Sequence, residues 1–198
     1  MTPEQLCRLI VTVADAVIEH TDEFTALDQA IGDGDHGLNM KRGFEAVRTD
    51  AAALAAKPLP EALDAIGLQL VMKIGGASGP LYGTLLMAMG KVISADGANI
   101  SAAFTGGVEA VKARGKSQAG QKTMLDVLVR IEAVMSASGP DLPHRLPAIA
   151  QAAAEATVAM EAIRGRASFL GARSVGHMDP GACSSALIIA AVCRALED

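Results

Sequence analysis

The segment from residue 28 to residue 39 concentrates most of the side chains in this sequence that could do chemistry. It reads Asp-Gln-Ala-Ile-Gly-Asp-Gly-Asp-His-Gly-Leu-Asn. Carboxylate oxygens on a tight, glycine-bent loop suit a hard cation such as Mg²⁺ or Ca²⁺ better than zinc. Asp33 and Asp35 are close enough to converge on one ion, and Asp28 can reach in from the preceding segment. A plain surface turn is the alternative; three acids beside a histidine and an asparagine favour a metal site.

Three better-known motifs are incompatible with these residues. The glycines of the segment satisfy a dinucleotide pattern, but the aspartates between them would repel a pyrophosphate by about 4 kcal/mol per contact at an effective dielectric near 20. An EF-hand is excluded because its glycine and glutamate positions hold Leu38 and Phe44. Gly115-Lys116-Ser117 resembles the end of a Walker loop, but the required first glycine falls on Ala110.

Length and composition predict one helical domain. With 198 residues the chain can form a single domain, residues 1–198, around a substantial core. It is 51% hydrophobic but only 3% aromatic, so Ala, Leu, Ile, Val and Met must fill that core, and this composition favours helices over strands. A formal net charge of −5 argues against a nucleic-acid partner.

The cysteines and the apolar stretches indicate a cytoplasmic protein outside the membrane. The three cysteines are odd in number and lack metal-ligand spacing, which is typical of reduced thiols. The longest uncharged apolar stretches, near 81–90 and 182–192, are too short to span a bilayer. The chain begins with a helix start, Thr2 as cap, Pro3 in the first turn and Gln5 closing a capping box, in place of a signal peptide.

Hydrophobic periodicity predicts about eight helices and no strand. Without repeats or linkers, they form a single all-α, antiparallel up-and-down bundle. The expected segments are roughly 3–20, 36–55, the stretch after Pro58 and Pro60 up to residue 74, the stretch after the 75–80 break, 100–115, 123–137, a segment following Pro140, Pro143 and Pro147, and a last one from Asp179-Pro180.

The breaks between these helices are rich in Gly, Ser, Thr, Asp and His. Helices that begin after residues 36, 78, 123 and 180 offer free N–H groups and a positive dipole end, which suits an anion. Each break alone could be an ordinary connection, but together they favour a site in the loops at one end of the bundle. A metal cluster beside several helix N-termini suits Mg²⁺ with a polyphosphate. The breaks are 28–39, 75–80, 115–123, 165–171 and 174–181.

In this order, these motifs resemble the nucleotide-binding L subunit of dihydroxyacetone kinase, the DhaL family, over nearly the whole chain. The resemblance implies a barrel of eight antiparallel amphipathic helices with a nucleotide site at one end. The matching segments are Leu27–Met40 with Arg42–Phe44, Gly75–Thr84, Lys122–Met124, Gly165–Ser168, Leu170–Gly171, Arg173–Ser174, Gly176–His177 and Asp179–Gly181.

By this resemblance Asp28, Asp33 and Asp35 hold two Mg²⁺ ions that clamp the phosphates of ADP or ATP. Three carboxylates and an ADP trianion carry roughly −6, which two Mg²⁺ reduce to roughly −2. No catalytic side chain is assigned, because the chemistry resides in the Mg-nucleotide. The residues implied to line the nucleotide are His36, Gly37, Leu38, Asn39, Ala77, Ser78, Gly120, Thr123, Met124, Arg166, Gly171, Asp179, Pro180 and Gly181.

The implied reaction is phosphoryl transfer to the hydroxyl of a small ketose, driven by positioning and charge neutralisation. The resemblance implies two partners: a K subunit that holds the ketose, and an M subunit of the sugar-phosphotransferase type that recharges ADP from a phosphohistidine. A homodimer is left open. One departure is Gln121, where the family usually has Asp before Lys-Thr-Met, which removes a charge near the site.

Three other functions remain as alternatives. The chain could be a Mg-ADP-binding adaptor or regulator without chemistry, or a subunit fed by free ATP that acts on a tetrulose. A helical scaffold stabilised by Mg²⁺ or Ca²⁺ would leave the motifs at 75–80 and 165–181 unexplained.

Overall fold

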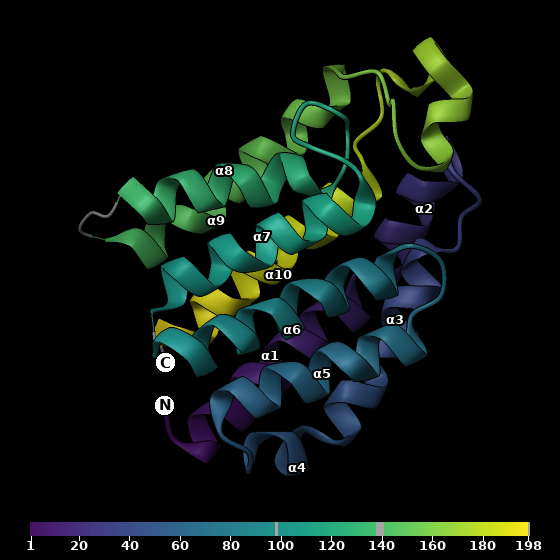
Figure 1. The fold of residues 1–198 in the computed structure, drawn as a ribbon. Coiled ribbons are helices and arrows are strands. Elements are labelled where there is room, and N and C mark those ends of the chain that lie inside the picture. The colour runs from purple at the N-terminus through teal and green to yellow at the C-terminus, as the bar shows by residue number, and fades with distance from the viewer. Residues whose placement is uncertain (98, 138–140, 198) are drawn as a thin grey trace.

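The computed structural model describes residues 1–97, 99–137 and 141–197. These residues form α-helices and two short 3₁₀ segments, with no strand among them (Figure 1), so the all-α prediction is confirmed. The elements are α1 (Pro3–Glu19), α2 (Thr21–Ile31), α3 (His36–Thr49), α4 (Ala51–Ala55), α5 (Leu59–Lys73), α6 (Ser78–Asp96), α7 (Ile100–Gly115), α8 (Met124–Ala137), α9 (Leu142–Ala156), η1 (Thr157–Ala159), η2 (Arg166–Ser174) and α10 (Pro180–Glu197).

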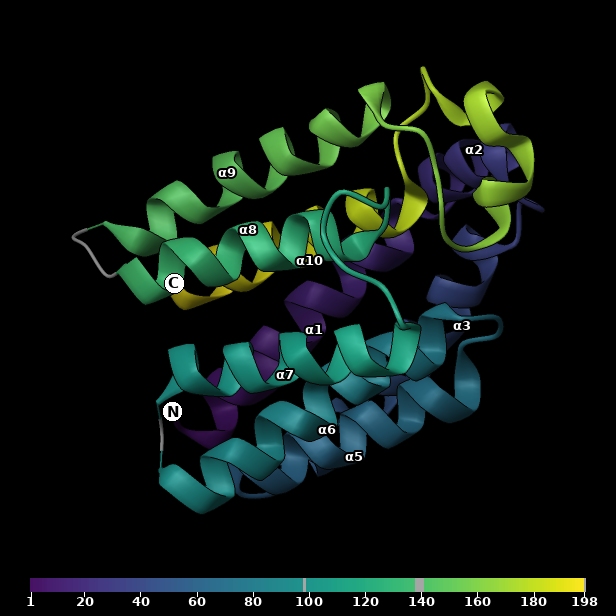
Figure 2. The same ribbon diagram turned by 45° about the horizontal axis from the view of Figure 1, so that its top comes forward.

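Eight of the helices pack into a closed ring, as the expected barrel requires. Each packs against the next in the order α1, α3, α5, α6, α7, α8, α9 and α10, and α10 returns to α1. Figure 2 shows α8, α9 and α10 grouped on one side and α5, α6 and α7 on the other. Two helices lie outside the ring order: α2 packs on α3 and α10, and the single turn of α4 packs on α1 and α5.

Small residues let these helices approach closely, because the chain has few aromatic side chains to fill a wide core. Buried alanines lie on several ring helices, and the large buried side chains include Phe24, Met40 and Leu125. One close contact joins α5 and α6: a Cβ added at Gly67 would lie 2.7 Å from the carbonyl oxygen of Gly83. Backbone contact therefore sets how closely these two helices pack.

The helices differ from the sequence-based prediction at three places. Helix α9 begins at Leu142 and contains Pro147, which was expected to precede it. The expected helix 36–55 ends at Thr49, and Asp50 separates α3 from α4. Helix α2 was not predicted, although its buried residues Thr21, Phe24, Asp28 and Ile31 are spaced by three and four. Only two of the four are large apolar side chains, so the periodic signal of hydrophobic residues is weak. The motif that begins at Asp28 is consequently helical in its first turn, and only residues 32–35 form a loop.

The whole of helix α10 is long and apolar enough to cross a membrane by length and composition alone, which by itself is weak evidence of a span. In the described structure it packs against α1, α8 and α9, and 39% of its residues are buried. A core helix of a bundle has the same composition as a span. This packing accounts for its apolar character.

The close contact of α5 with α6 yields a stability test. Gly67→Ala should lower the free energy of unfolding by about 1–3 kcal/mol despite the better helix propensity of Ala, because its Cβ meets Gly83 backbone and the Met87 side chain. The matched control is Gly115→Ala, whose Cβ meets nothing closer than 3.5 Å. Urea unfolding of both variants checks this, and equal midpoints would show that the contact is not tight.

Candidate functional site

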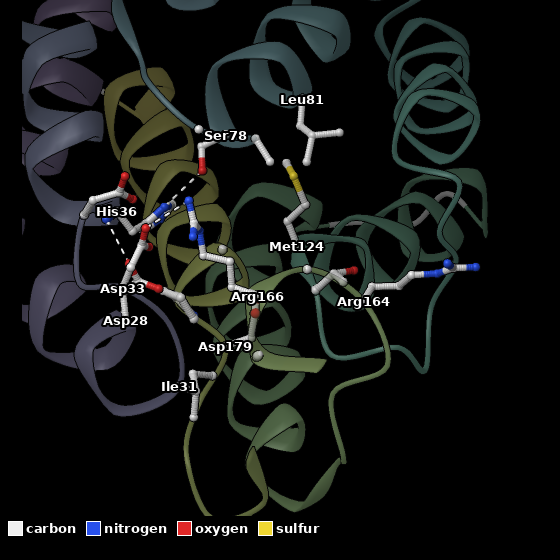
Figure 3. Close-up of a pocket in the computed structure, with 18 of the residues that line it drawn as sticks. Asp28, Ile31, Asp33, His36, Ser78, Leu81, Met124, Arg164, Arg166 and Asp179 are labelled. Atoms are coloured by element: carbon white, nitrogen blue, oxygen red, sulfur yellow. Dashed lines mark hydrogen bonds and ion pairs between the residues drawn. The ribbon is translucent and has the colours of Figure 1, made fainter. Parts of the chain in front are cut away.

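Four helices begin around one pocket at the end of the barrel (Figure 3). They are α3, α6, α8 and α10, which begin at His36, Ser78, Met124 and Pro180, as predicted from the breaks. The pocket has a cavity volume of about 190 Å³ and is open to solvent. The positive dipole ends of the four helices lie at this end of the barrel, which favours an anionic ligand.

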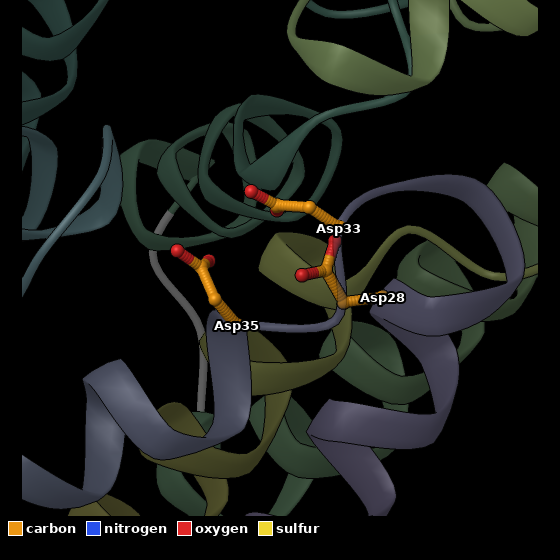
Figure 4. Close-up of side chains that lie close together, drawn as sticks. All are labelled: Asp28, Asp33 and Asp35. Atoms are coloured by element: carbon orange, nitrogen blue, oxygen red, sulfur yellow. The ribbon is translucent and has the colours of Figure 1, made fainter.

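Three carboxylates converge on one edge of this pocket (Figure 4). Asp28 lies in the last turn of α2, Asp33 lies in the loop, and Asp35 immediately precedes α3. One oxygen from each lies within 4.8 Å of the others; Asp28 is buried and the other two are exposed. The loop needs glycine twice: a Cβ at Gly32 would lie 2.1 Å from Asp28 Oδ1, and Gly34 has a φ of +76°.

Nearby donors partly compensate the charge of these carboxylates. The backbone N–H of His36, at the start of α3, donates to Asp28 Oδ2 at 3.1 Å. The guanidinium of Arg166 reaches across the pocket from η2 and pairs with Asp33 Oδ2 at 3.0 Å. Figure 3 shows this ion pair bridging two walls of the pocket. The arrangement could hold a divalent cation with oxygen ligands.

His36 ties three of the helix starts together through its buried ring. Its Nδ1 lies 3.0 Å from Ser78 Oγ, and its Nε2 lies 2.9 Å from Ser184 Oγ on α10. Burial lowers its pKa, against the opposing pull of the nearby carboxylates. A neutral imidazole has one donor and one acceptor, and hydroxyls can match both. Both ring nitrogens are therefore engaged within the protein.

Tyr82 extends this buried network between α6 and α10. Its hydroxyl lies 2.8 Å from the hydroxyl oxygens of both Ser184 and Ser185, and donates to the carbonyl of Gly181 at 3.3 Å. Burial raises the pKa of Tyr82. Since both partners lie in the first turns of α10, this contact fixes the end of α10 that faces the pocket.

The loop before α8 is held by two side chains that the sequence reasoning did not assign. The Asp126 carboxylate accepts the N–H of Gly120 at 2.5 Å and of Thr123 at 2.7 Å. Gln121 Oε1 accepts from Ser117 Oγ at 2.9 Å, and also from the Gln118 N–H and Arg164. At the position where the resemblance expects Asp, an amide oxygen therefore serves as the acceptor that shapes this loop.

Asp179 caps α10 at the opposite wall of the pocket. Its Oδ2 accepts the N–H of Ala182 at 2.7 Å, and its own N–H donates to Thr157 Oγ1 at 3.0 Å. Burial raises the pKa of its carboxyl to about 7, with the charge of Asp126 acting in the same direction and that of Lys122 opposing it. The pocket wall thus carries a carboxyl that titrates near neutrality.

The structure brings most, but not all, of the expected nucleotide-lining residues to this pocket. Those that line it are His36, Ala77, Ser78, Thr123, Met124, Arg166, Asp179, Pro180 and Gly181, together with Asp28, Asp33 and Asp35. Those that do not line it are Gly37, Leu38, Asn39, Gly120 and Gly171.

The excluded residues have other places in the fold. Gly37 packs against α2, where a Cβ would lie 2.1 Å from the carbonyl oxygen of Thr21. The side chain of Leu38 is 62% exposed, and Asn39 is buried and accepts from Arg42. Gly120 and Gly171 both have positive φ, of 85° and 54°, and shape their loops.

Several pocket residues were not among those expected. Lys122 and Tyr82 lie inside the motifs that carry the resemblance, so the motifs could have indicated that they lie at the site. Nothing in the sequence predicts which groups they contact. The same holds for Ile31, Gly75, Gly76, Leu81, Gly165 and Ala167, whereas Arg164 lies outside the motifs and has no sequence signal.

The raised pKa of Asp179 predicts a pH dependence of stability. The folded chain keeps this proton up to about pH 7, whereas an unfolded Asp releases it near 3.8, so the associated stability is present at low pH and is lost as pH rises through 7. Asp179→Asn keeps the acceptor for the Ala182 N–H without the charge. The Tm of the variant minus that of the wild type should be about 5–10 °C larger at pH 8 than at pH 5, because about two pH units of linkage correspond to about 2.7 kcal/mol. Thermal unfolding at both pH values checks this; a constant offset would contradict the assignment.

Comparison with known proteins assigns the family. A model described as the DAK2 domain matches residues 30–194. The chain is 40% identical over 181 residues to the ADP-binding subunit DhaL of PEP-dependent dihydroxyacetone kinase 1 from Listeria innocua, covering 90% of this chain and 89% of that protein. It is also 40% identical over 190 residues to the corresponding DhaL subunit of Escherichia coli, covering 91% and 90%.

Longer relatives contain the same domain. Triokinase/FMN cyclase of Rattus norvegicus is 34% identical over 206 residues, which covers 98% of this chain and 35% of that protein. Among solved structures, the dihydroxyacetone kinase from C. freundii in complex with AMP-PNP and Mg²⁺ is similar with a TM-score of 0.81 and 26% identity, covering 96% of this chain and 33% of that chain. The chain therefore belongs to the DAK2 domain family, which includes the DhaL subunits of dihydroxyacetone kinase.

Proposed function

We propose that this chain is the ADP/ATP-binding subunit of a dihydroxyacetone-type ketose kinase, and that residues 1–198 form one nucleotide-binding domain. The observation that carries the proposal is the meeting of Asp28, Asp33 and Asp35 with four helix N-termini in one pocket. The relatives named as ADP-binding subunits, and the solved relative in complex with AMP-PNP and Mg²⁺, support it.

The carboxylates fit Mg²⁺ by their chemistry. All three offer oxygen, the hard ligand that Mg²⁺ prefers, and two of them are exposed, which leaves room for phosphate oxygens and water. Asp28, Asp33 and Asp35 would hold the metal, with two ions as the proposed number. Bound there, Mg²⁺ would neutralise the nucleotide phosphates and the charge that develops on them during transfer.

The helix starts support a position for the nucleotide phosphates in the pocket. Ala77 and Ser78 precede and begin α6, so their backbone N–H groups would face the phosphates. Pro180, which has no N–H, and Gly181 would contribute the positive dipole end of α10. The exposed guanidinium of Arg166 already pairs with Asp33, and it can turn from that carboxylate to a phosphate oxygen when a metal takes its place.

The apolar part of the pocket would take the adenine. Met124 and Leu81 both line the pocket and point toward one another in Figure 3, with Ile31 on another side. Thr123 adjoins Met124 at the start of α8 and offers a hydroxyl. His36 orients Ser78 and the start of α10 from behind, which makes it a positioning residue in this proposal.

The proposed partners supply the ketose and the phosphate donor. The titratable side chains of the pocket belong to the metal cluster or to buried hydrogen bonds, so we propose that the ketose is presented by a separate K subunit at the open end of the barrel. The names of the relatives as PEP-dependent kinase subunits support recharging of ADP by a phosphohistidine-bearing M subunit in the cytoplasm. The nucleotide would then remain bound as a coenzyme.

Removing one carboxylate should abolish tight nucleotide binding without unfolding the chain. In Asp33→Ala or Asp35→Ala the phosphates face the remaining acids with less metal to shield them, so Mg-ADP should bind at least about 100-fold more weakly. ADP retained after desalting measures this. Asp64→Ala, an exposed acid on α5, is the matched control. Retention equal to wild type in both site variants would disprove the metal assignment.

Mg²⁺ and ADP should stabilise the fold only together. A ligand present at a hundredfold excess over Kd adds about 2.7 kcal/mol, which corresponds to a rise in Tm of about 5–10 °C for a chain of this size. ADP with EDTA, or Mg²⁺ without ADP, should each produce a much smaller rise. Equal rises with ADP in the presence and absence of metal would contradict a shared site.

The chain alone should phosphorylate no sugar. Transfer requires the acceptor oxygen to be held in line with the terminal phosphate, and positioning supplies most of the catalysis. Mixing with a K subunit and a phosphate donor, either an M subunit or ATP, should produce sugar phosphate. Sugar phosphate formed by the purified chain without a partner would place the acceptor site within these residues and refute the subunit proposal.

A further inference from the structure

The side chain of Lys122 is fully buried beside the pocket, although lysine is among the residue types least often buried. It directly precedes Thr123 and the start of α8, with a left-handed backbone φ of 59°. A lysine is strained in that conformation. The fold therefore keeps this residue at a position that suits neither its charge nor its backbone.

The ammonium group of Lys122 is enclosed by three backbone carbonyls. Its Nζ donates to the carbonyl oxygens of Thr157 at 2.8 Å, Met160 at 3.1 Å and His177 at 2.5 Å. An ammonium has three N–H donors and each carbonyl is an acceptor, so the two sets match completely. Its charge is attracted to Asp179, the cap of α10, while burial lowers its pKa.

These carbonyls lie at the two ends of one long connection, from the end of α9 to the start of α10. The connection contains Arg164–Ala167, which form one wall of the pocket. Its ends are also joined by the N–H of Gly176, which donates to Val158 at 2.8 Å. Lys122 thus joins the start of α8 to both ends of the segment that carries Arg166.

We propose that Lys122 is a positioning residue whose buried ammonium closes the 157–177 segment against the start of α8, and thereby assembles two walls of the nucleotide site. Neither the matched family model nor the names of the relatives assign this contact. The effect of Lys122 on nucleotide binding rests on the proposed function. The closure of the 157–177 segment by Lys122 is independent of that function.

Limited proteolysis tests the closure without any nucleotide. The segment contains the exposed trypsin sites Arg164, Arg166 and Arg173. In Lys122→Met, cleavage there should accelerate at least about tenfold, while cleavage at the exposed Arg48 on α3 stays at the wild-type rate. Lys116→Met, at an exposed lysine that also has positive φ, is the matched control and should behave as wild type.

Two outcomes would overturn the closure. Unchanged cleavage at all sites would show that Lys122 does not hold the segment, and equal acceleration at Arg48 would show a general loss of stability. If Lys122→Met does not fold, Lys122→Gln takes its place. Because it retains two N–H donors, cleavage in the segment should accelerate by a smaller factor but still exceed the wild-type rate, with cleavage at Arg48 unchanged.

Chemical rescue tests the effect on the site. Lys122→Ala leaves a space with the shape of n-propylammonium next to the three carbonyls, and should bind Mg-ADP at least about tenfold more weakly than wild type. Added n-propylammonium should restore binding, whereas equimolar tetramethylammonium, which has the charge but no N–H donor, should not. Wild-type-like binding by Lys122→Ala, or no restoration by n-propylammonium, would refute the positioning role. Failure of the wild type to bind Mg-ADP would refute the proposed function and leave the proteolysis result standing.

Discussion

The mutual repulsion of three carboxylates is the constraint on which the functional end of this protein depends. At 4.8 Å and an effective dielectric near 20, each pair of charges repels by about 3 kcal/mol. The fold brings them together through glycines that leave room for Asp28 and turn the chain, and it compensates them with the first N–H of α3 and with Arg166. A cation completes this compensation, which is why the proposed function rests on this cluster.

The barrel supplies the second requirement, four helix N-termini facing one pocket. Where helices pack through alanine and glycine, backbone contact sets how closely they approach. The starts of α3, α6 and α10 are then joined by His36, whose ring meets a serine on each side. Asp126 and Lys122 hold the start of α8 and the segment that carries Arg166. The site is therefore built on helix ends held by buried polar contacts.

Much of this could be predicted from the sequence, for local reasons. Glycine, proline and aspartate mark where helices begin, and the spacing of the aspartates indicated their convergence. Consecutive residues of a helix face different sides, which explains why His36 lines the pocket whereas Gly37, Leu38 and Asn39 do not. The contacts of Lys122 could not be predicted, because its partners are backbone carbonyls 35 to 55 residues away that carry no side-chain signal.

The central claim is that the three carboxylates bind the metal that holds the nucleotide. A crystal structure of the chain with ADP and Mn²⁺, a stand-in for Mg²⁺ with an anomalous signal, tests it most directly. The account predicts anomalous peaks within about 2.3 Å of carboxylate oxygens of Asp28, Asp33 and Asp35, shared with the ADP phosphates. Nucleotide bound with no anomalous peak at this cluster, or phosphates placed away from the starts of α6 and α10, would contradict it.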